Sequence, residues 1–439
     1  MEQTLQQVFA NLRVPFNMQR SATHTNDSGS TRSASLGAST VLRRAYRAIW
    51  LFGLLPACFN PKYDHPACGP NGACPSGLTC NAQLICEDGE GAINDAGIDT
   101  PGIPPVDART CFGTGIVQVC LASAPTQPLA ISNLTTIDTM TSSMCVPTVS
   151  GGTNYCVVAA TSIMINGTLR ATGAKPLVLV ASDSISVSQL IDVGSHRTPP
   201  EFIGAGADPA TCMAGTPAGT RGGGAGGSFT GKGGNGGNAA AAGAGGQAAN
   251  GTTPITELRG GCPGQDGDGG GKGAGGHGGG AVYLIAVNRI DITGPGINAA
   301  GEGGDSGKGG PAAAPISSGA GGGGAGGMIG FDAPTITCAS LLLANGGAGG
   351  EGSGVTTDGA PGADPSTTAA APGGTGNSVI GGDGGNGSSG AAAGPGTNGI
   401  NGSSMASNDG GGGGGGGGAG LIKGPMAKLG SNVSPSATP

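Results

Sequence analysis

The chain has 439 residues and a formal net charge of −7; 97 residues are glycine, whereas aromatic residues make up only 3%. This glycine content is about three times the usual share, and with so few aromatic residues it excludes one ordinary globular core throughout the chain. The absence of a strict glycine at every third position excludes a collagen triple helix. The acidic, lysine-poor composition does not fit a nucleic-acid-binding protein.

The first predicted element is an export signal that ends at residue 57. The stretch RRAYRAIWLFGLLPAC starts with Arg43 and Arg44, continues through an apolar run from Ala48 and ends at Cys58. This order is typical of a secretory signal, and the apolar run is too short to span a bilayer. The last four residues resemble a bacterial lipobox, which implies lipid attachment at Cys58 and a membrane anchor rather than a span. The alternative is a plain secretory signal with Cys58 in a disulfide.

Residues 1–40 form an unusually long polar stretch ahead of this signal. The true start is therefore either Met1 or Val41, and residues 1–57 are interpreted as pre-sequence and signal peptide. Phe59, rather than an aspartate, follows the cysteine. Under the usual sorting rule this predicts an outer-membrane lipoprotein, on either the periplasmic or the cell-surface side.

Residues 58–88 form a small cysteine-rich module with almost no apolar residues. Its four cysteines are spaced six apart: Cys68, Cys74, Cys80 and Cys86. So short a segment has no hydrophobic core, and two disulfides are expected to hold it together. A zinc site is the rival interpretation, although zinc-binding cysteines usually lie about two to four residues apart. The pattern resembles the small EGF-like modules of exported bacterial lipoproteins. Residues 89–110 follow as an acidic linker rich in proline and glycine.

Residues 111–154 are predicted to cap the region that follows. Two further disulfides are expected among four cysteines whose pairing the spacing leaves open: Cys111, Cys120, Cys145 and Cys156. Cys212 and Cys262 lie in one glycine-rich stretch, and we expect them to pair. Cys338 occupies an inward strand position, which predicts a buried free thiol that packs as a small hydrophobic group.

Residues 155–439 contain a strand-rich unit that recurs in four full copies, starting at Tyr155, Leu177, Val282 and Met328, and in a truncated copy from Leu421. In each full copy the second apolar run starts eight residues after the first apolar residue. Short strands at one fixed spacing predict an all-β fold, namely a parallel β-helix or solenoid. The side chains expected to point inward are Tyr155, Val157, Ile163, Ile165, Leu169, Leu177, Leu179, Ile185, Val187, Ile191, Val282, Leu284, Ile290, Ile292, Ile297, Met328, Ile336 and Leu342.

The outward side of the first strand in these copies is apolar as well. Its residues are Val158, Val178, Val180, Tyr283, Ile285, Ile329 and Phe331. A strand that is apolar on both sides is normally covered on both faces. Another part of the chain is therefore expected to pack over this outer face.

Long glycine-rich inserts leave the repeat at residues 195–280, 301–327 and 345–420. They show a local three-residue period, as in KGGNGGN from Lys232, which is the period of a polyproline II helix. Two conformations remain open: polyglycine II-like helices that bundle together, or disorder, because ordering glycine costs the most entropy. Partial bundling is favoured, since the outer face needs a cover. The nine glycines from Gly410 to Gly418 are expected to be the loosest part.

Over residues 111–439 this organisation resembles the glycine-rich β-helix surface lipoproteins of myxobacterial-type bacteria. The GGAGG and GGNGG runs of the inserts are similar to the polymorphic glycine-rich repeat proteins of mycobacteria. The first resemblance implies a protein displayed at the cell envelope. The second concerns the inserts alone.

The repeat shows no shared catalytic or metal-binding constellation. The candidate ionisable residues on its coils are Asp183, Asp192, Arg289, Asp291 and Asp332. Only one copy carries a neighbouring pair of opposite charges, which is typical of an exposed ion pair. The histidines fall in four separate segments: His24, His65, His196 and His277. The aspartates in the glycine-rich runs lack the apolar residue and nine-residue spacing of calcium-binding repeats.

The sequence therefore predicts an exported envelope lipoprotein with a structural or adhesive role and without catalysis or a cofactor. The expected partners are the membrane, through Cys58, and a polysaccharide or another surface protein, but no nucleic acid. The alternatives are a polysaccharide-acting β-helix enzyme, either lyase or hydrolase, and a calcium-binding glycine-rich repeat protein.

Overall fold

The computed structural model describes residues 110–148, 151–152, 154–197, 201–240, 243–313, 316–406, 408–425 and 428–439, with the backbone of 79–80 and 86–87. The chain divides into two compact units, Met1–Ile98 and Asp99–Pro439. In the first unit, β1 (Thr79–Cys80) and β2 (Cys86–Glu87) pair antiparallel. The predicted signal, the lipidation site Cys58 and the side chains of the cysteine-rich module lie outside the described residues.

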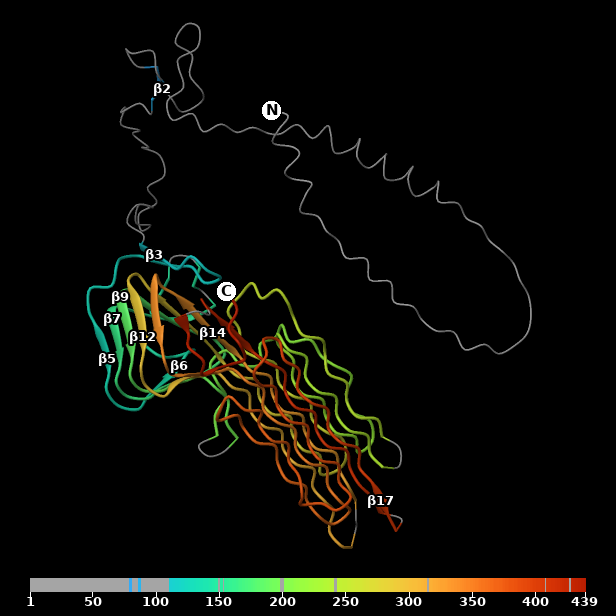
Figure 1. Ribbon diagram of the computed structural model, residues 1–439. Helices are drawn as coiled ribbons and strands as arrows, with labels where there is room; N and C mark the ends of the chain where they lie inside the picture. The colour runs from blue at the N-terminus through green and yellow to red at the C-terminus, as the bar shows by residue number, and fades with distance from the viewer. Residues whose placement is uncertain are drawn as a thin grey trace, which may run out of the picture. The chain divides into compact units, whose positions relative to one another are not determined.

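The second unit contains two parallel sheets and a large array of glycine-rich segments (Figure 1). The larger sheet follows the order β15-β12-β9-β11-β14-β19, and β7 joins it by pairing with both β9 and β5. These strands are β5 (Leu129–Ile131), β7 (Cys156–Ile165), β9 (Leu177–Val187), β11 (Ala281–Ala286), β12 (Arg289–Ile292), β14 (Met328–Asp332), β15 (Thr335–Cys338) and β19 (Leu421–Lys423).

The smaller sheet has the order β20-β16-β13-β10-β8-β6, and its strands also pair in parallel. Its strands are β6 (Thr135–Asp138), β8 (Leu169–Thr172), β10 (Ile191–Asp192), β13 (Gly296–Asn298), β16 (Leu341–Leu343) and β20 (Val433–Ser434). Side chains from both sheets form one aliphatic core, in which Leu169, Ile185 and Ile290 are fully buried. Two short antiparallel hairpins complete the unit: β3 (Thr110–Phe112) with β4 (Val119–Leu121), and β17 (Ser404–Met405) with β18 (Asn408–Asp409).

The prediction of a parallel β-helix or solenoid was wrong, because the described strands form parallel sheets that do not close into a helix. Long glycine-rich excursions separate β10 from β11, β13 from β14 and β16 from β19. The path of the chain from the smaller sheet back to the larger sheet is therefore interrupted at each of these three places. The fold is all-β, and parallel pairing between the repeated strands holds it together.

The predicted alignment of the copies was also wrong in two of them: Cys156 rather than Tyr155 pairs with Leu177, and Ile329 rather than Met328 pairs with Val282. β9 carries one more residue than β7 between the paired positions Ala160 and Ser162, so the alternation shifts there. Tyr155, Val157 and Met328 consequently belong to the outer apolar cluster rather than to the core between the sheets. Three residues predicted to face outward lie in that core instead: Val158, Ile329 and Phe331.

The outer face of the larger sheet is covered, as predicted. Val178, Val180, Tyr283 and Ile285 pack in one cluster with residues from two other parts of the chain. One part is the β3–β4 region, and the other is the glycine-rich array: Phe112, Val117, Val119, Leu121, Phe229, Leu258 and Ala325. The array is thus anchored to the sheets by hydrophobic burial.

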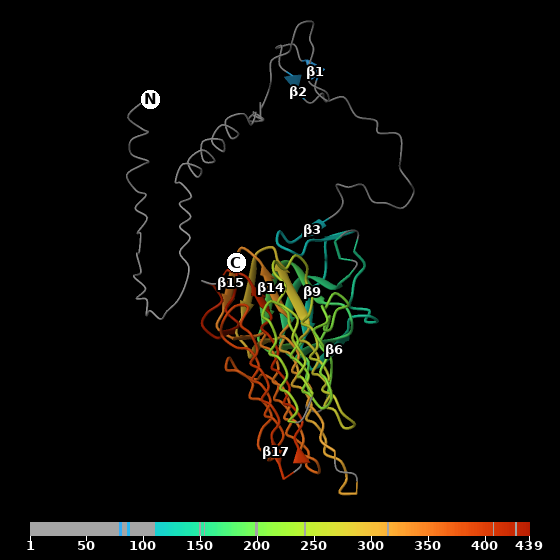
Figure 2. The ribbon, with the colours of Figure 1, turned by 90° about the vertical axis from the view of Figure 1, so that its right-hand side faces the viewer.

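The glycine-rich segments lie side by side as extended chains that hydrogen-bond to one another through their backbones (Figures 1 and 2). The central segment, residues 410–420, shows the pattern most clearly. Its N–H groups donate in rotation, every third residue to the same neighbour, to carbonyls of three segments: 221–227, 344–353 and 394–403. Its carbonyls accept in the same rotation from three others: 231–240, 320–326 and 382–388. Three residues per turn with outward-pointing backbone groups define a polyglycine II arrangement.

The prediction that Gly410–Gly418 would be the loosest part was wrong, since all nine glycines are buried. A Cβ on Gly414 would lie 1.9 Å from the carbonyl oxygen of Gly321, and one on Gly416 would lie 1.9 Å from that of Asn386. A segment with hydrogen-bonded neighbours on every side has no direction in which a side chain fits. The run without larger residues is therefore the centre of the array.

In segments at the surface of the array, one of the three positions in each turn faces no neighbouring segment. Polar residues occupy such positions. The backbone N–H of Asn235 donates to Oδ1 of Asn398, and that of Asn238 donates to Oδ1 of Asn401, both at 2.8 Å. Oδ1 of Asn238 in turn accepts from the N–H of Gly245 at 2.8 Å. Outward asparagines thus satisfy backbone donors that would otherwise depend on water.

Replacing Gly414 with alanine is expected to destabilise the protein by at least about 2 kcal/mol, because the methyl group would overpack the array interior. The matched control is Gly270→Ala, since a Cβ there would meet only the flexible end of Ile316. Urea unfolding of both variants would measure the difference. Equal unfolding midpoints for the two variants would contradict the proposed packing.

Candidate functional site

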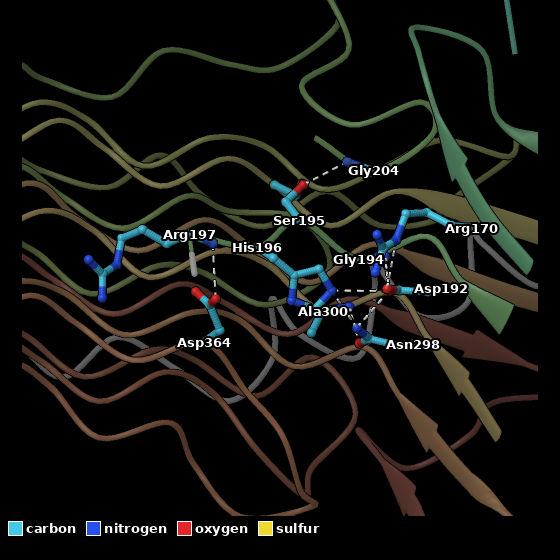
Figure 3. Close-up of polar contacts among 11 residues, drawn as sticks. Arg170, Asp192, Gly194, Ser195, His196, Arg197, Gly204, Asn298, Ala300 and Asp364 are labelled. Carbon is cyan, nitrogen blue, oxygen red and sulfur yellow. Dashed lines mark hydrogen bonds and ion pairs between the residues drawn. The ribbon is translucent and has the colours of Figure 1, made fainter. Parts of the chain in front are cut away.

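Polar side chains gather where the smaller sheet meets the glycine-rich array (Figure 3). The parallel register places Arg170, Asp192 and Asn298 side by side on β8, β10 and β13. Asp192 is only 3% exposed. Its Oδ1 accepts from Nδ2 of Asn298 at 3.0 Å and lies 3.1 Å from Nε2 of His196, while Oδ2 lies 3.6 Å from Nε of Arg170. The buried carboxylate is therefore surrounded by donors.

His196 is held between this carboxylate and an aromatic ring. Its ring lies 4.7 Å from that of Phe202, and the Arg170 guanidinium lies 4.3 Å from the Phe202 ring centre. Burial alone would lower the pKa of His196. The hydrogen bond and negative charge of Asp192, with a further contribution from Asp364, outweigh burial and raise it above its ordinary value.

The neighbouring Ser195 does not complete a catalytic triad with His196 and Asp192. Its buried Oγ donates to the carbonyl of Gly278 at 2.5 Å and accepts from the N–H of Gly204 at 3.0 Å. Figure 3 shows the contact with Gly204 leading away from the histidine. Ser195 is thus occupied in joining the sheet edge to the array, and the cluster does not present a nucleophile beside its base.

Asp364 connects the loop after β10, which contains Ser195 and His196, to a further glycine-rich segment. Its Oδ2 accepts from the backbone N–H of Arg197 at 3.0 Å, and its Oδ1 accepts from that of Gly303 at 2.8 Å. Both oxygens are therefore engaged in fixing backbone position.

A second histidine–carboxylate pair lies within the array. Nδ1 of His277 is 2.5 Å from Oδ2 of Asp208, and Glu302, only 5% exposed, accepts from the backbone N–H of His277 at 3.0 Å. The hydrogen bond and charge of Asp208 raise the pKa of His277, while burial raises the pKa of Glu302. His277 and Glu302, together with Glu201 and Asp305, line a cavity of about 400 Å³.

The remaining ionisable residues singled out in the sequence are not brought together. Asp183 accepts from Nδ2 of Asn288 at 2.7 Å. Arg289 is 63% exposed and forms a 3.1 Å ion pair with Asp291, while Asp332 accepts from the backbone N–H of Gly115 at 3.0 Å. Asp192 and His196 are the two that share a cluster; His24 and His65 lie outside the described residues.

The cysteines of the second unit are placed as follows. Disulfides join Cys111 to Cys120, Cys145 to Cys156 and Cys212 to Cys262. Cys338 is a buried free cysteine, and burial raises the pKa of its thiol. Within the described residues, no group of three or more His, Cys, Asp or Glu side chains is placed to hold a metal ion.

Glu351 is a structurally important residue that the sequence pattern did not reveal. It lies in an interior segment and is fully buried, and its Oε2 accepts from the N–H groups of Ala360 at 2.7 Å and Asn377 at 3.0 Å. Its Oε1 accepts from the N–H of Ser378 at 2.8 Å. In the sequence it is the third residue of the second GGX triplet in a GGAGGEGS run, a triplet position at which surface segments carry exposed residues such as Asn238 and Asn386. The local sequence does not distinguish a buried glutamate at this position from an exposed one.

Apolar side chains are exposed at the end of the array that lies far from the sheets, where Figures 1 and 2 place β17. Val379 is 82% exposed, Met405 55% and Ile316 46%. Val355, Val379 and Met405 line a cavity of about 260 Å³, and the backbone of Ile316 bonds to the carbonyl of Val355. These four side chains are named the apolar tip.

Comparison of the chain with protein-family models, with curated proteins and with solved structures finds no match. Within the described residues, no helical stretch combines the length and hydrophobicity needed to cross a bilayer.

Replacing Glu351 with glutamine is expected to destabilise the protein by about 2 kcal/mol, because an amide NH₂ would face backbone donors that the carboxylate now accepts. Unfolding in urea would be compared with that of Asp291→Asn, which alters an exposed ion pair and should change stability by less than about 0.5 kcal/mol. Similar losses in both variants would argue against the anchoring role of Glu351.

The His196–Asp192 contact should stabilise the protein most at acidic pH. Because the folded-state pKa of His196 is raised, this stabilisation is fully present below the unfolded value of about 6.5 and is lost as pH rises through the folded value. The difference in unfolding free energy between the native chain and His196→Gln should therefore decrease as the pH rises. An NMR titration giving His196 a pKa below about 6.5 would refute this assignment.

Proposed function

We propose that the protein is an exported, non-catalytic envelope protein with a structural or adhesive role, and that the glycine-rich array presents the apolar tip to a binding partner. The observation that carries the proposal is the central segment, whose residues bond through the backbone to neighbours on every side. Such packing supports a stiff projection, since each segment is fixed by several others. A stiff projection with exposed aliphatic side chains at its end suits contact rather than catalysis.

Further features support this assignment. Three disulfides in the second unit favour an oxidising compartment. The lipobox-like residues before Cys58 favour a lipid anchor in the outer membrane. The exposure of Val379 and Met405 is unusual for aliphatic side chains without a function, because several of them lie together. The expected partner is a polysaccharide-bearing surface or another surface protein.

The proposal predicts that the double variant Val379→Ser with Met405→Ser loses binding. Retention of the purified protein on immobilised bacterial envelope fragments should fall by about tenfold, because central apolar contacts contribute most of the energy of an interface. The matched control is Val287→Ser, which changes a 50% exposed valine between β11 and β12.

Equal retention of the tip variant and the native chain would overturn the proposed contact site. Shortening of envelope polysaccharide by the native protein would instead favour the enzymatic alternative. Circular dichroism of each variant would verify that the fold is intact.

A further inference from the structure

Three neighbouring segments form one side of the glycine-rich array: 394–403, 231–240 and 243–249. The middle one, 231–240, hydrogen-bonds through its backbone to both others and, on its inner side, to the central segment. Its N–H groups at Asn235 and Asn238 have no backbone partner among the described residues. The side of this row that faces away from the central segment is therefore open.

Four asparagines, two from each of the first two segments, lie on this open side: Asn235, Asn238, Asn398 and Asn401. They are named the asparagine face. As described above, Asn398 and Asn401 accept through Oδ1 from backbone N–H groups of the middle segment. Oδ1 of Asn235 accepts likewise from the N–H of Ala248 at 3.0 Å, and Oδ1 of Asn238 accepts from that of Gly245 at 2.8 Å. Each amide thus bridges to the next segment of the row, and these contacts fix its orientation because only its oxygen can accept.

The nitrogens of these four amides, in contrast, are not used. Within the described part of the chain, none of the four Nδ2 atoms has a hydrogen-bond partner, and each carries two donor hydrogens. The asparagines recur at every third residue, which corresponds to about 9 Å along a helix that rises about 3.1 Å per residue. The asparagine face therefore presents fixed donors at a regular spacing along two adjacent segments.

The charge of this side differs from that of the whole protein. None of the three segments contains an aspartate or a glutamate, although the chain has a formal net charge of −7. Lys232, three residues before Asn235, is exposed and has no ion pair in the part of the chain that the structure describes. Unused donors beside a cation favour a partner that is negatively charged and rich in hydrogen-bond acceptors.

We propose that the asparagine face binds an extended acidic polysaccharide, whose carboxylates and hydroxyl oxygens accept from the four amides and from Lys232. The amides are already held in place, so binding costs little side-chain entropy. A polymer presents acceptors repeatedly, and several modest contacts along one stiff segment reinforce one another. The asparagine face shares no residue with the apolar tip, and the proposal holds whether or not the tip makes a contact.

The test is isothermal titration calorimetry of the full chain with polygalacturonate, dextran and polyglutamate. Polygalacturonate carries a carboxylate and hydroxyls on each sugar, dextran is an uncharged polysaccharide, and polyglutamate has carboxylates without sugar hydroxyls. Polygalacturonate should bind at least about tenfold more tightly than either of the others, because it alone offers both kinds of acceptor. Absence of binding to polygalacturonate, or equal binding of dextran or polyglutamate, would overturn the proposal.

The double variant Asn398→Asp with Asn401→Asp locates the site. It keeps the oxygens that accept from the middle segment but replaces the donors with negative charge, so binding of polygalacturonate should weaken at least about tenfold. The matched control is Asn166→Asp with Asn432→Asp, which makes the same change of charge at two exposed asparagines outside the array. The control should bind as the native chain does, and equal weakening of both double variants would overturn the proposed site.

The tip variant Val379→Ser with Met405→Ser separates this proposal from the contact at the apolar tip. It should bind polygalacturonate as tightly as the native chain, even where its retention on envelope fragments falls. Loss of polygalacturonate binding in the tip variant would overturn the assignment of this ligand to the asparagine face.

Discussion

The structure depends on the close approach of backbones that only glycine permits. Ordering glycine costs more conformational entropy than ordering any other residue. The array offsets this cost because nearly every donor and acceptor of an interior segment finds a backbone partner. A methyl group at most interior positions would lie near 2 Å from a carbonyl oxygen. Glycine is therefore required for packing, and its abundance in this chain does not indicate disorder.

The sheets and the array each bury a surface that the other leaves exposed. Without Phe229 and Leu258 from the array, the outer side of the larger sheet would expose valine and isoleucine side chains to water. Conversely, the glycine-rich segments start and end at strands that hold their spacing. Polar contacts reinforce this junction, since Ser195 and Asp364 each connect the loop after β10 with the glycine-rich segments. The two parts are thus expected to unfold together.

Sequence periodicity predicted the strands, the apolar outer face and the three-residue pattern of the glycine runs. It failed at positions where one residue shifts the alternation, as between Ala160 and Ser162, because a local irregularity leaves no trace in hydrophobicity. It also failed at Gly410–Gly418, where the absence of larger side chains reflects complete enclosure rather than freedom. The polar cluster was only partly visible, because Asp192 and Asn298 lie far apart in the chain and meet through strand register alone. Glu351 resembles any outward residue of a GGX run until its neighbours are known.

The outward asparagines have a consequence for the chemical durability of the chain. Several precede glycine, the sequence in which an asparagine side chain most readily cyclises to a succinimide, because the next backbone nitrogen attacks the side-chain carbonyl. In the array that nitrogen is already committed: the N–H of Gly399 donates to the carbonyl of Asn235, and that of Gly402 to the carbonyl of Asn238, each at 2.8 Å. The packing of the array therefore protects its asparagines from deamidation. They should deamidate slowly while the protein is folded and rapidly once it unfolds.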